Sequence, residues 1–182
     1  TGEKATVYGF ELEAKTTLIK NKDEESILNF TGNLTKMWLQ QDLFKDFQYK
    51  NITKSSLQGA SDFIANGSLT YSNLKEKEFI ATLTGNYSSD KIYALGSPED
   101  FSNSASLYND EIIEKGFIAL DLVVSKKLSE NLMLKLVGRN LLNPEIKQSQ
   151  LVKSLITDVE TNQTVLSYKK GSQLSLSVKY SF

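Results

Sequence analysis

The last twelve residues of the chain, 171–182, constrain its fold most strongly. From position 174 onward large apolar residues occupy every second place and polar residues stand between them; the apolar set is Leu174, Leu176, Val178, Tyr180 and Phe182. Strict alternation with a period of two predicts a β-strand with one apolar face. This phase runs to a final aromatic residue, where soluble domains usually fray in water. A protein core or the hydrocarbon of a membrane could cover such a face.

The composition limits what can surround this apolar face. The 182 residues are 40% hydrophobic, and none of their apolar runs approaches the roughly eighteen residues of a transmembrane helix. Membrane-spanning β-strands remain possible, because alternation hides their hydrophobicity. Lys and Arg total 21 against 22 Asp and Glu, so the chain lacks the excess of positive charge that is typical of proteins that bind nucleic acid. It begins at Thr1 without methionine or signal peptide, which indicates a mature product or a fragment.

The residue types also restrict the chemistry. Cysteine and histidine are both absent, which removes disulfides, thiol catalysis and the commonest acid–base group and metal ligand. Glu11 and Glu13 share one face of the first alternating segment, with Lys15 beside them. We interpret them as lining a watery interior rather than as an acid–base or metal pair. The sequence therefore predicts no catalysis, no cofactor and no metal site.

Seven strands running up and down are expected from the alternation, at residues 5–19, 27–40, 62–72, 78–95, 117–128, 132–150 and 165–182. The first is much longer than the five or six residues typical of globular strands. A tilted membrane strand needs about nine to eleven residues. The upper part of the last segment is expected to project beyond a membrane.

Pairing of the first two segments fixes which residues share a height. If Leu18 lies opposite Leu28, Leu12 lies opposite Leu34 and Tyr8 lies opposite Trp38. Aromatic residues then bracket the aliphatic ones at both ends of the first strands, as in the two interfacial girdles of an outer-membrane barrel. The predicted girdle residues are Tyr8, Phe10, Trp38, Phe63, Tyr71, Phe79 and Tyr87. Lys36 falls in the same outward phase near one rim, where its long side chain can snorkel.

A later hairpin predicts an ion pair on the other face. Pairing Leu128 with Leu132 places Val124 opposite Leu136 and Asp121 opposite Arg139. The sequence therefore predicts a salt bridge between Asp121 and Arg139 on the inner wall.

The connections alternate in length. Short ones are expected at residues 21–26, 73–77 and 129–131, long polar ones at 42–61 and 97–115, and a last turn near 160–163. Outer-membrane barrels have short turns at one end and long loops at the other. Single-chain bacterial barrels have even strand numbers, however, so seven strands indicate either one missed strand or part of a larger barrel.

Several short stretches resemble the C-terminal barrel portion of TonB-dependent outer-membrane receptors, in particular those with a carboxypeptidase-like N-terminal extension. They are residues 8–13, 57–61, 91–93, 120–122, the stretch from 132 that ends in the Arg-Asn-Leu-Leu-Asn segment at 139–143, and the final Tyr-Ser-Phe at 180–182. Their order and spacing span essentially the whole chain.

The resemblance implies an all-β fold: an antiparallel, up-and-down transmembrane barrel of 22 strands, closed by a plug. Residues 1–182 would be its last seven strands, without the plug and the N-terminal strands. The implied function is import of a scarce nutrient, such as an iron chelate, vitamin, glycan or peptide, across the outer membrane of a Gram-negative bacterium. Implied partners are outer-membrane lipid, the rest of the barrel and its plug, TonB, a surface lipoprotein and the barrel-assembly machinery, which would read the terminal strand ending at Phe182.

Two alternatives of other classes remain open. One is a self-contained eight-stranded outer-membrane barrel with a structural or adhesive role, and the other is a soluble β-sandwich that binds a ligand. Candidates for outer contacts with a ligand are aromatic residues of the long loops, namely Phe44, Phe47, Tyr49, Phe101 and Tyr108.

Overall fold

A computed structural model describes residues 4–23, 25–45, 48, 52–73, 78–96, 108–154 and 157–182. The described chain is all-β, and its strands pair antiparallel. In chain order the strands are β1 (Ala5–Lys20), β2 (Ser26–Asp42), β3 (Lys54–Ser55), β4 (Phe63–Asn73), β5 (Phe79–Ser88), β6 (Lys91–Ala94), β7 (Tyr108–Glu114), β8 (Phe117–Ser129), β9 (Leu132–Arg139), β10 (Glu145–Lys153), β11 (Glu160–Lys169) and β12 (Gln173–Tyr180).

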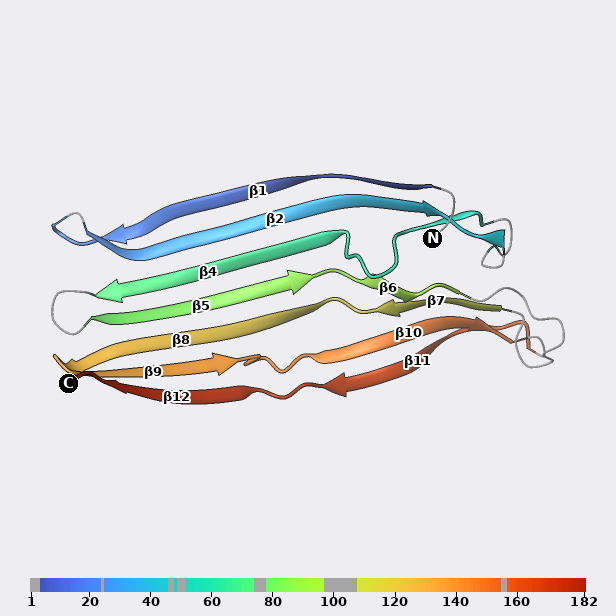
Figure 1. Cartoon of the computed structure of the whole chain (residues 1–182). Helices are drawn as coiled ribbons and strands as arrows, with labels where there is room; N and C mark the ends of the chain where they lie inside the picture. The colour runs from blue at the N-terminus through green and yellow to red at the C-terminus, as the bar shows by residue number, and fades with distance from the viewer. Residues whose placement is uncertain are drawn as a thin grey trace.

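The strands form two sheets that lie end to end. The large sheet has the order β1-β2-β4-β5-β8-β9-β12, with β3 added to β2, and the small sheet has the order β11-β10-β7-β6. Figure 1 shows that β6, β7, β10 and β11 prolong the strands of the lower half of the large sheet. The short connections lie at one end of the large sheet and the long ones at the other, as the sequence predicts. We call these the turn end and the loop end.

The expectation of seven continuous strands is wrong for the second half of the chain. Four interruptions, at residues 89–90, 115–116, 140–144 and 170–172, separate the large sheet from the small one. We call these four segments the joint. Residues 108–114, expected within a loop, form β7, and residues 160–163, expected as a turn, begin β11. Three of the four interruptions have only two or three residues, so alternation continues through them and does not reveal them.

The register of the first hairpin agrees with the prediction over most of its length. Tyr8 pairs with Trp38 and Leu12 with Leu34, but Ile19, not Leu18, pairs with Leu28. A bulge near the turn absorbs the extra residue. The later hairpin behaves in the same way. Val124 pairs with Leu136 as expected, but because of a bulge Leu132 pairs with Ser129 and not with Leu128.

Burial is confined to the loop end. The buried apolar residues of the described chain are Leu43, Ile92 and Ile146, which follow β2 or lie in β6 and β10, and none of its large side chains is fully enclosed. The large sheet therefore has no hydrophobic core of its own. The sheet is also open in the described chain, since β1 and β12 are the two ends of the strand path.

Candidate membrane-facing surface

The register aligns apolar side chains across all seven strands of the large sheet. We define the apolar face by the residues in phase with Leu12, since cross-strand partners point to the same side of a sheet. Its aliphatic members are Leu12, Leu28, Leu34, Leu69, Leu83, Ile118, Leu120, Leu122, Val124, Leu132, Leu134, Leu136, Leu174, Leu176 and Val178. Leu12, Leu83 and Leu176 are 59%, 38% and 65% exposed. No second layer of the described chain covers this face, so a sandwich core within these residues is excluded.

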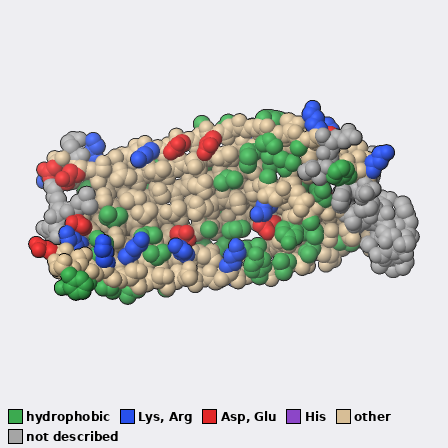
Figure 2. Space-filling view, in the orientation of Figure 1, with side chains coloured by type: hydrophobic (Ala, Val, Ile, Leu, Met, Phe, Trp, Pro, Cys, Tyr) green, Lys and Arg blue, Asp and Glu red, His purple; other side chains and the backbone are tan. Residues whose placement is uncertain are grey.

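The opposite face carries hydroxyls and amides. Asn66 donates its side-chain amide to Asn33 Oδ1 at 2.7 Å, and the hydroxyls of Thr70 and Thr82 lie 3.1 Å apart on the next pair of strands. Figure 2 views one face of the molecule, whose centre is mostly backbone and side chains that are neither hydrophobic nor charged. Charged side chains lie mainly along its upper and lower borders. The large sheet is thus two-faced, and every strand contributes to both faces.

Aromatic rings gather at both ends of the apolar face. Near the loop end, Tyr8 and Trp38 stack at 5.3 Å between ring centroids, and Phe63 lies 6.1 Å from Tyr87. Phe10 joins the first pair, with its ring 6.0 Å from that of Trp38. The structure therefore brings the predicted loop-end aromatics together in pairs.

At the turn end, Tyr71 lies 6.0 Å from Phe79. Tyr180 meets Phe182 edge to face at 5.1 Å, on the same side of the sheet as the rest of the terminal apolar set. Phe182 follows β12 and is fully exposed. All seven predicted girdle residues thus share the apolar face, in two groups separated by aliphatic residues.

Two lysines are in phase with the apolar face: Lys126, whose register partner is Leu134, near the turn end, and Lys36 near the loop end. Lys36 pairs in the register with Phe10 and Phe63, and its ammonium group forms an ion pair with the carboxylate of Asp62. Asp62 also accepts a hydrogen bond from Ser89 Oγ at 2.6 Å. The charge is therefore neutralised at the loop-end rim, among the aromatic rings.

The predicted salt bridge between Asp121 and Arg139 is not formed. Asp121 Oδ1 instead accepts a hydrogen bond from the backbone N–H of Asn140 at 2.8 Å, and no ion pair in the described chain joins it to Arg139. The strands β8 and β9 stop pairing at Leu122 and Gly138, one step before these residues would meet. The chain turns there, because Asn140 adopts a φ of 54°.

The Asn-Leu-Leu-Asn segment at 140–143 connects two of the four segments of the joint. Asn140 and Asn143 both have positive φ, which asparagine tolerates better than most residues. Their side chains cross to the neighbouring interruption: Asn140 Nδ2 donates to Gly171 O at 2.7 Å, and Asn143 Oδ1 accepts from Gly171 N–H at 2.9 Å. Gly171 itself has a φ of 82°. These bonds hold the β9–β10 and β11–β12 interruptions side by side.

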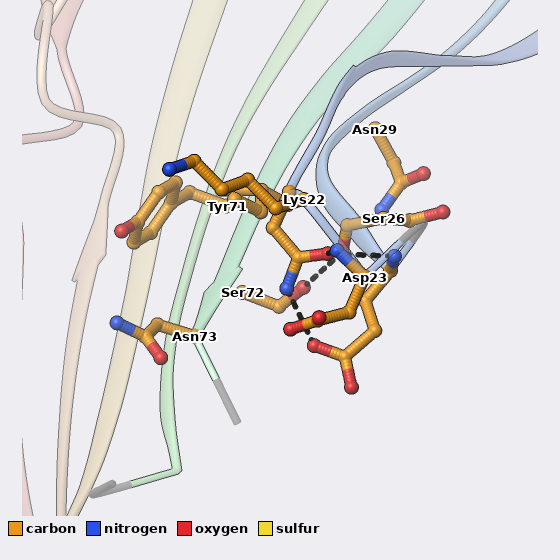
Figure 3. Close-up of a pocket in the computed structure, with 10 residues that line it drawn as sticks. Lys22, Asp23, Ser26, Asn29, Tyr71, Ser72 and Asn73 are labelled. Atoms are coloured by element: carbon orange, nitrogen blue, oxygen red, sulfur yellow. Dashed lines mark hydrogen bonds between the residues drawn. The ribbon is translucent and has the colours of Figure 1, made fainter. Parts of the chain in front are cut away.

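A cavity opens beside the first turn at the turn end. It has a volume of about 670 Å³ and is lined by residues 21–23, 25–27, 29 and 71–73. Asn21 Oδ1 accepts hydrogen bonds from the backbone N–H groups of Asp23 and Glu25, which fixes the turn. Figure 3 shows the Lys22 side chain extending toward the ring of Tyr71 across the cavity. The walls carry both charge signs, so they favour no particular ligand charge.

The loop aromatics are only partly described. Phe44 is 51% exposed just beyond β2, and Tyr108 opens β7. Phe47, Tyr49 and Phe101 lie outside the described residues. Glu11, Glu13 and Lys15 lie on the polar face of β1, where their register partners are Thr35, Asn33 and Thr31.

The chain was compared with protein families, with curated proteins and with solved structures. No protein-family model, no curated protein and no solved structure matches the chain. Within the described residues, none of the groups of acidic side chains could hold a metal ion, and no helix is both long and apolar enough to cross a bilayer.

Proposed function

We propose that this chain forms part of the wall of a β-barrel in the outer membrane of a Gram-negative bacterium. The observation that carries the proposal is the continuous apolar face across seven strands, whose aliphatic residues are exposed or half-buried, in a molecule with three buried apolar residues among those described. Monomeric soluble proteins rarely expose contiguous apolar patches larger than a few hundred Å². Acyl chains would cover this face, while water and protein would cover the polar face.

The dimensions of the apolar face support this proposal. Phe63 and Tyr71 mark the two aromatic ends of β4, eight residues apart. Eight steps span about 27 Å along a strand. A tilt of about 35–45° reduces this to about 20 Å, and the rings at both ends bring it near the roughly 25 Å band of outer-membrane barrels. The ion pair of Lys36 then lies at the membrane–water boundary, where a charge is tolerated.

The free edges favour a larger barrel. Both β1 and β12 run toward the turn end (Figure 1), so pairing them directly would create a parallel contact in an antiparallel sheet. If an odd number of further strands lies between β1 and β12, every strand of the closed sheet can run antiparallel to both of its neighbours. Since lipid leaves exposed backbone groups unsatisfied, both edges need partner strands. We infer that these come from the same polypeptide, as in a 22-stranded barrel with a plug.

The resemblance in sequence extends the proposal to a TonB-dependent receptor that imports a scarce nutrient. The Asn-Leu-Leu-Asn segment, one of the stretches that carry the resemblance, has a definite structural task at the joint. The proposed partners are lipid, the remaining barrel and its plug, TonB, the barrel-assembly machinery and a surface lipoprotein. Deletion of the gene should abolish TonB-dependent growth on one limiting nutrient and leave growth on abundant nutrients unchanged.

Trp38, the only tryptophan, tests the membrane assignment directly. With the protein reconstituted in vesicles, lipids brominated near the glycerol end of the acyl chain should quench its fluorescence more than lipids brominated near the terminal methyl. Equal quenching by water-soluble iodide in vesicles and in denaturant would show a ring in water and would overturn the assignment. A tryptophan introduced by Leu12→Trp in a Trp38→Phe background should reverse the depth preference.

A further inference from the structure

Two lysines stand at the turn end of the apolar face, on either side of the aromatic pair formed by Tyr71 and Phe79. Lys22 lies in the turn between β1 and β2, and Lys126 lies near the end of β8. The strands that carry the two rings, β4 and β5, come between them in the sheet. We call Lys22, Tyr71, Phe79 and Lys126 the turn-end cluster.

Lys22 reaches the apolar face from the turn. Figure 3 shows its side chain extending toward the ring of Tyr71, whereas Asp23 lies away from that ring. Asp23 and Glu25 also line the cavity, and the Asn21 side-chain amide donates to Glu25 Oε2 at 2.6 Å within the turn. The positive end of the cavity is therefore the side next to Tyr71, where the ammonium group ends.

Lys126 reaches the same border from the other side. Its register partner on β9 is Leu134, which belongs to the apolar face. Ile80 and Ser125 are register partners, so the next positions, Phe79 and Lys126, stand side by side on β5 and β8. A lysine at the end of an apolar strand face can extend its ammonium group past the rings into the membrane–water boundary.

The two lysines of the turn-end cluster have no counter-ion within the part of the chain that the structure describes. Lys36, at the opposite border of the apolar face, is neutralised by Asp62. Lys127, on the polar face, lies 2.8 Å from the carboxylate of Glu78. Lys22 and Lys126 form no ion pair or hydrogen bond there. The apolar face thus ends in uncompensated positive charge at its turn end and in neutralised charge at its loop end.

A glycerophospholipid matches this arrangement of charge and apolar surface. Its phosphate is an anion directly above two acyl chains. Leu69 and Leu83 are register partners on the apolar face, one outward-facing step from Tyr71 toward the loop end. Acyl chains on these leucines bring the phosphate to the height of the rings, where aromatic side chains meet lipid headgroups. Two ammonium groups and the Tyr71 hydroxyl can donate hydrogen bonds to phosphate oxygens there.

We propose that the turn-end cluster binds the phosphate groups of glycerophospholipids and so fixes the height of the wall in the membrane. The inference rests on the proposed function, which places the apolar face against acyl chains. Short turns face the periplasm in outer-membrane barrels, so the lipids are those of the periplasmic leaflet. The neutralised loop end lacks such a site, and the two borders of the apolar face therefore differ in the lipids that they hold.

Native mass spectrometry of the intact protein tests the inference. The protein is released from bilayers that contain equal amounts of phosphatidylglycerol and of a monoglucosyl diacylglycerol with the same acyl chains, which lacks the phosphate. Lys22→Gln with Lys126→Gln should lower the fraction of protein that retains phosphatidylglycerol at least about threefold, because basic residues at a membrane surface attract anionic lipid. Retention of the glucosyl lipid should not change. Arginine at both positions should keep the wild-type retention.

Lys127→Gln is the matched control, because Lys127 is the neighbour of Lys126 on β8 and lies on the opposite face. It should retain phosphatidylglycerol as the wild type does. Equal retention by the wild type and the double Gln variant would overturn the inference, and so would an equal loss in Lys127→Gln. Quenching of Trp38 in bilayers of the glucosyl lipid alone separates the two proposals. A Trp38 ring that stays in the lipid while phosphatidylglycerol retention is unaffected would overturn the lipid site and leave the membrane assignment standing.

Discussion

Tyr8 of β1 and Trp38 of β2 are direct register partners, and their rings stack at 5.3 Å with an angle of 11° between planes. An aromatic pair of this kind contributes about 0.5–1.5 kcal/mol beyond the area it buries. Because a slip of one residue would send the two rings to opposite faces, the pair also fixes the register of the longest hairpin. The stack lies at the loop-end border of the apolar face.

The first prediction concerns Trp38 itself. Trp38→Asp places a charge where the proposed interface begins and removes the stack with Tyr8, so assembly into the outer membrane should fall severalfold. Trp38→Phe keeps a ring at this position and should assemble nearly normally. Quantitative immunoblots of outer-membrane fractions measure both variants. Normal yield of the Asp variant would contradict the placement of this ring against lipid.

A second prediction separates the two faces with neighbouring residues. Leu12→Arg puts a charge at the middle of the apolar face, where an arginine in a bilayer costs about 2–4 kcal/mol, and should block assembly. Glu13→Arg is the matched control, because Glu13 lies on the polar face opposite Asn33 and should tolerate the change. Folding yields in lipid vesicles give the comparison. Equal yields for the two variants would mean that the faces have been assigned incorrectly.

A third prediction concerns close approach of two backbones. A Cβ at Gly9 would lie 2.4 Å from the carbonyl oxygen of Lys36, and backbone cannot move aside as a side chain can. Gly9→Ala should therefore destabilise the β1–β2 pairing by about 1–3 kcal/mol, the usual cost of overpacking. At Gly85 a Cβ would meet only the Leu120 side chain, at 3.9 Å, so Gly85→Ala should be nearly neutral. Urea unfolding in detergent distinguishes the two.

Alternation made the large sheet predictable. The pairs Leu12–Leu34, Tyr8–Trp38 and Val124–Leu136 follow from the phase of the apolar residues, because the side-chain period of a strand is two. The two bulges near the turns shifted the register locally without changing that phase. This is why Leu18 and Leu128 were given the wrong partners while residues farther from the turns were placed correctly.

The joint could not be derived from alternation. Asn140 and Asn143 turn the chain through backbone angles and through bonds to Gly171, a residue 28 to 31 positions away. Such bonds depend on which interruptions become neighbours in space. The missing ion pair at Asp121 has the same origin, because the turn at Asn140 supplies a backbone N–H to that carboxylate. Asn-x-x-Asn next to Pro144 was the available signal for a turn.

A fourth prediction concerns the end of the chain. Phe182 is fully exposed and packs edge to face on Tyr180, so its removal should cost the folded sheet little. If the assembly machinery reads this residue, deleting Phe182 should lower the amount of protein in the outer membrane severalfold while refolding into detergent stays normal. Ser181→Ala is the control, because the Ser181 backbone N–H bond to Asn131 O survives it. A parallel loss of refolding would indicate a structural role instead.

The last prediction concerns the joint, where acidification should weaken a contact of the Asp90 carboxylate. Burial by itself raises the pKa of Asp90, but hydrogen bonds from Lys115 Nζ and from Gly116 N–H, both at 2.8 Å, lower it overall. A lowered pKa means that the ionised form stabilises the folded state above the usual carboxyl range, and that this contribution is lost as the pH falls toward the folded pKa. Exchange protection of the Gly116 amide should therefore decrease in acid. Asp90→Asn should remove this pH response at Gly116; a response that survives the substitution would assign it to another group.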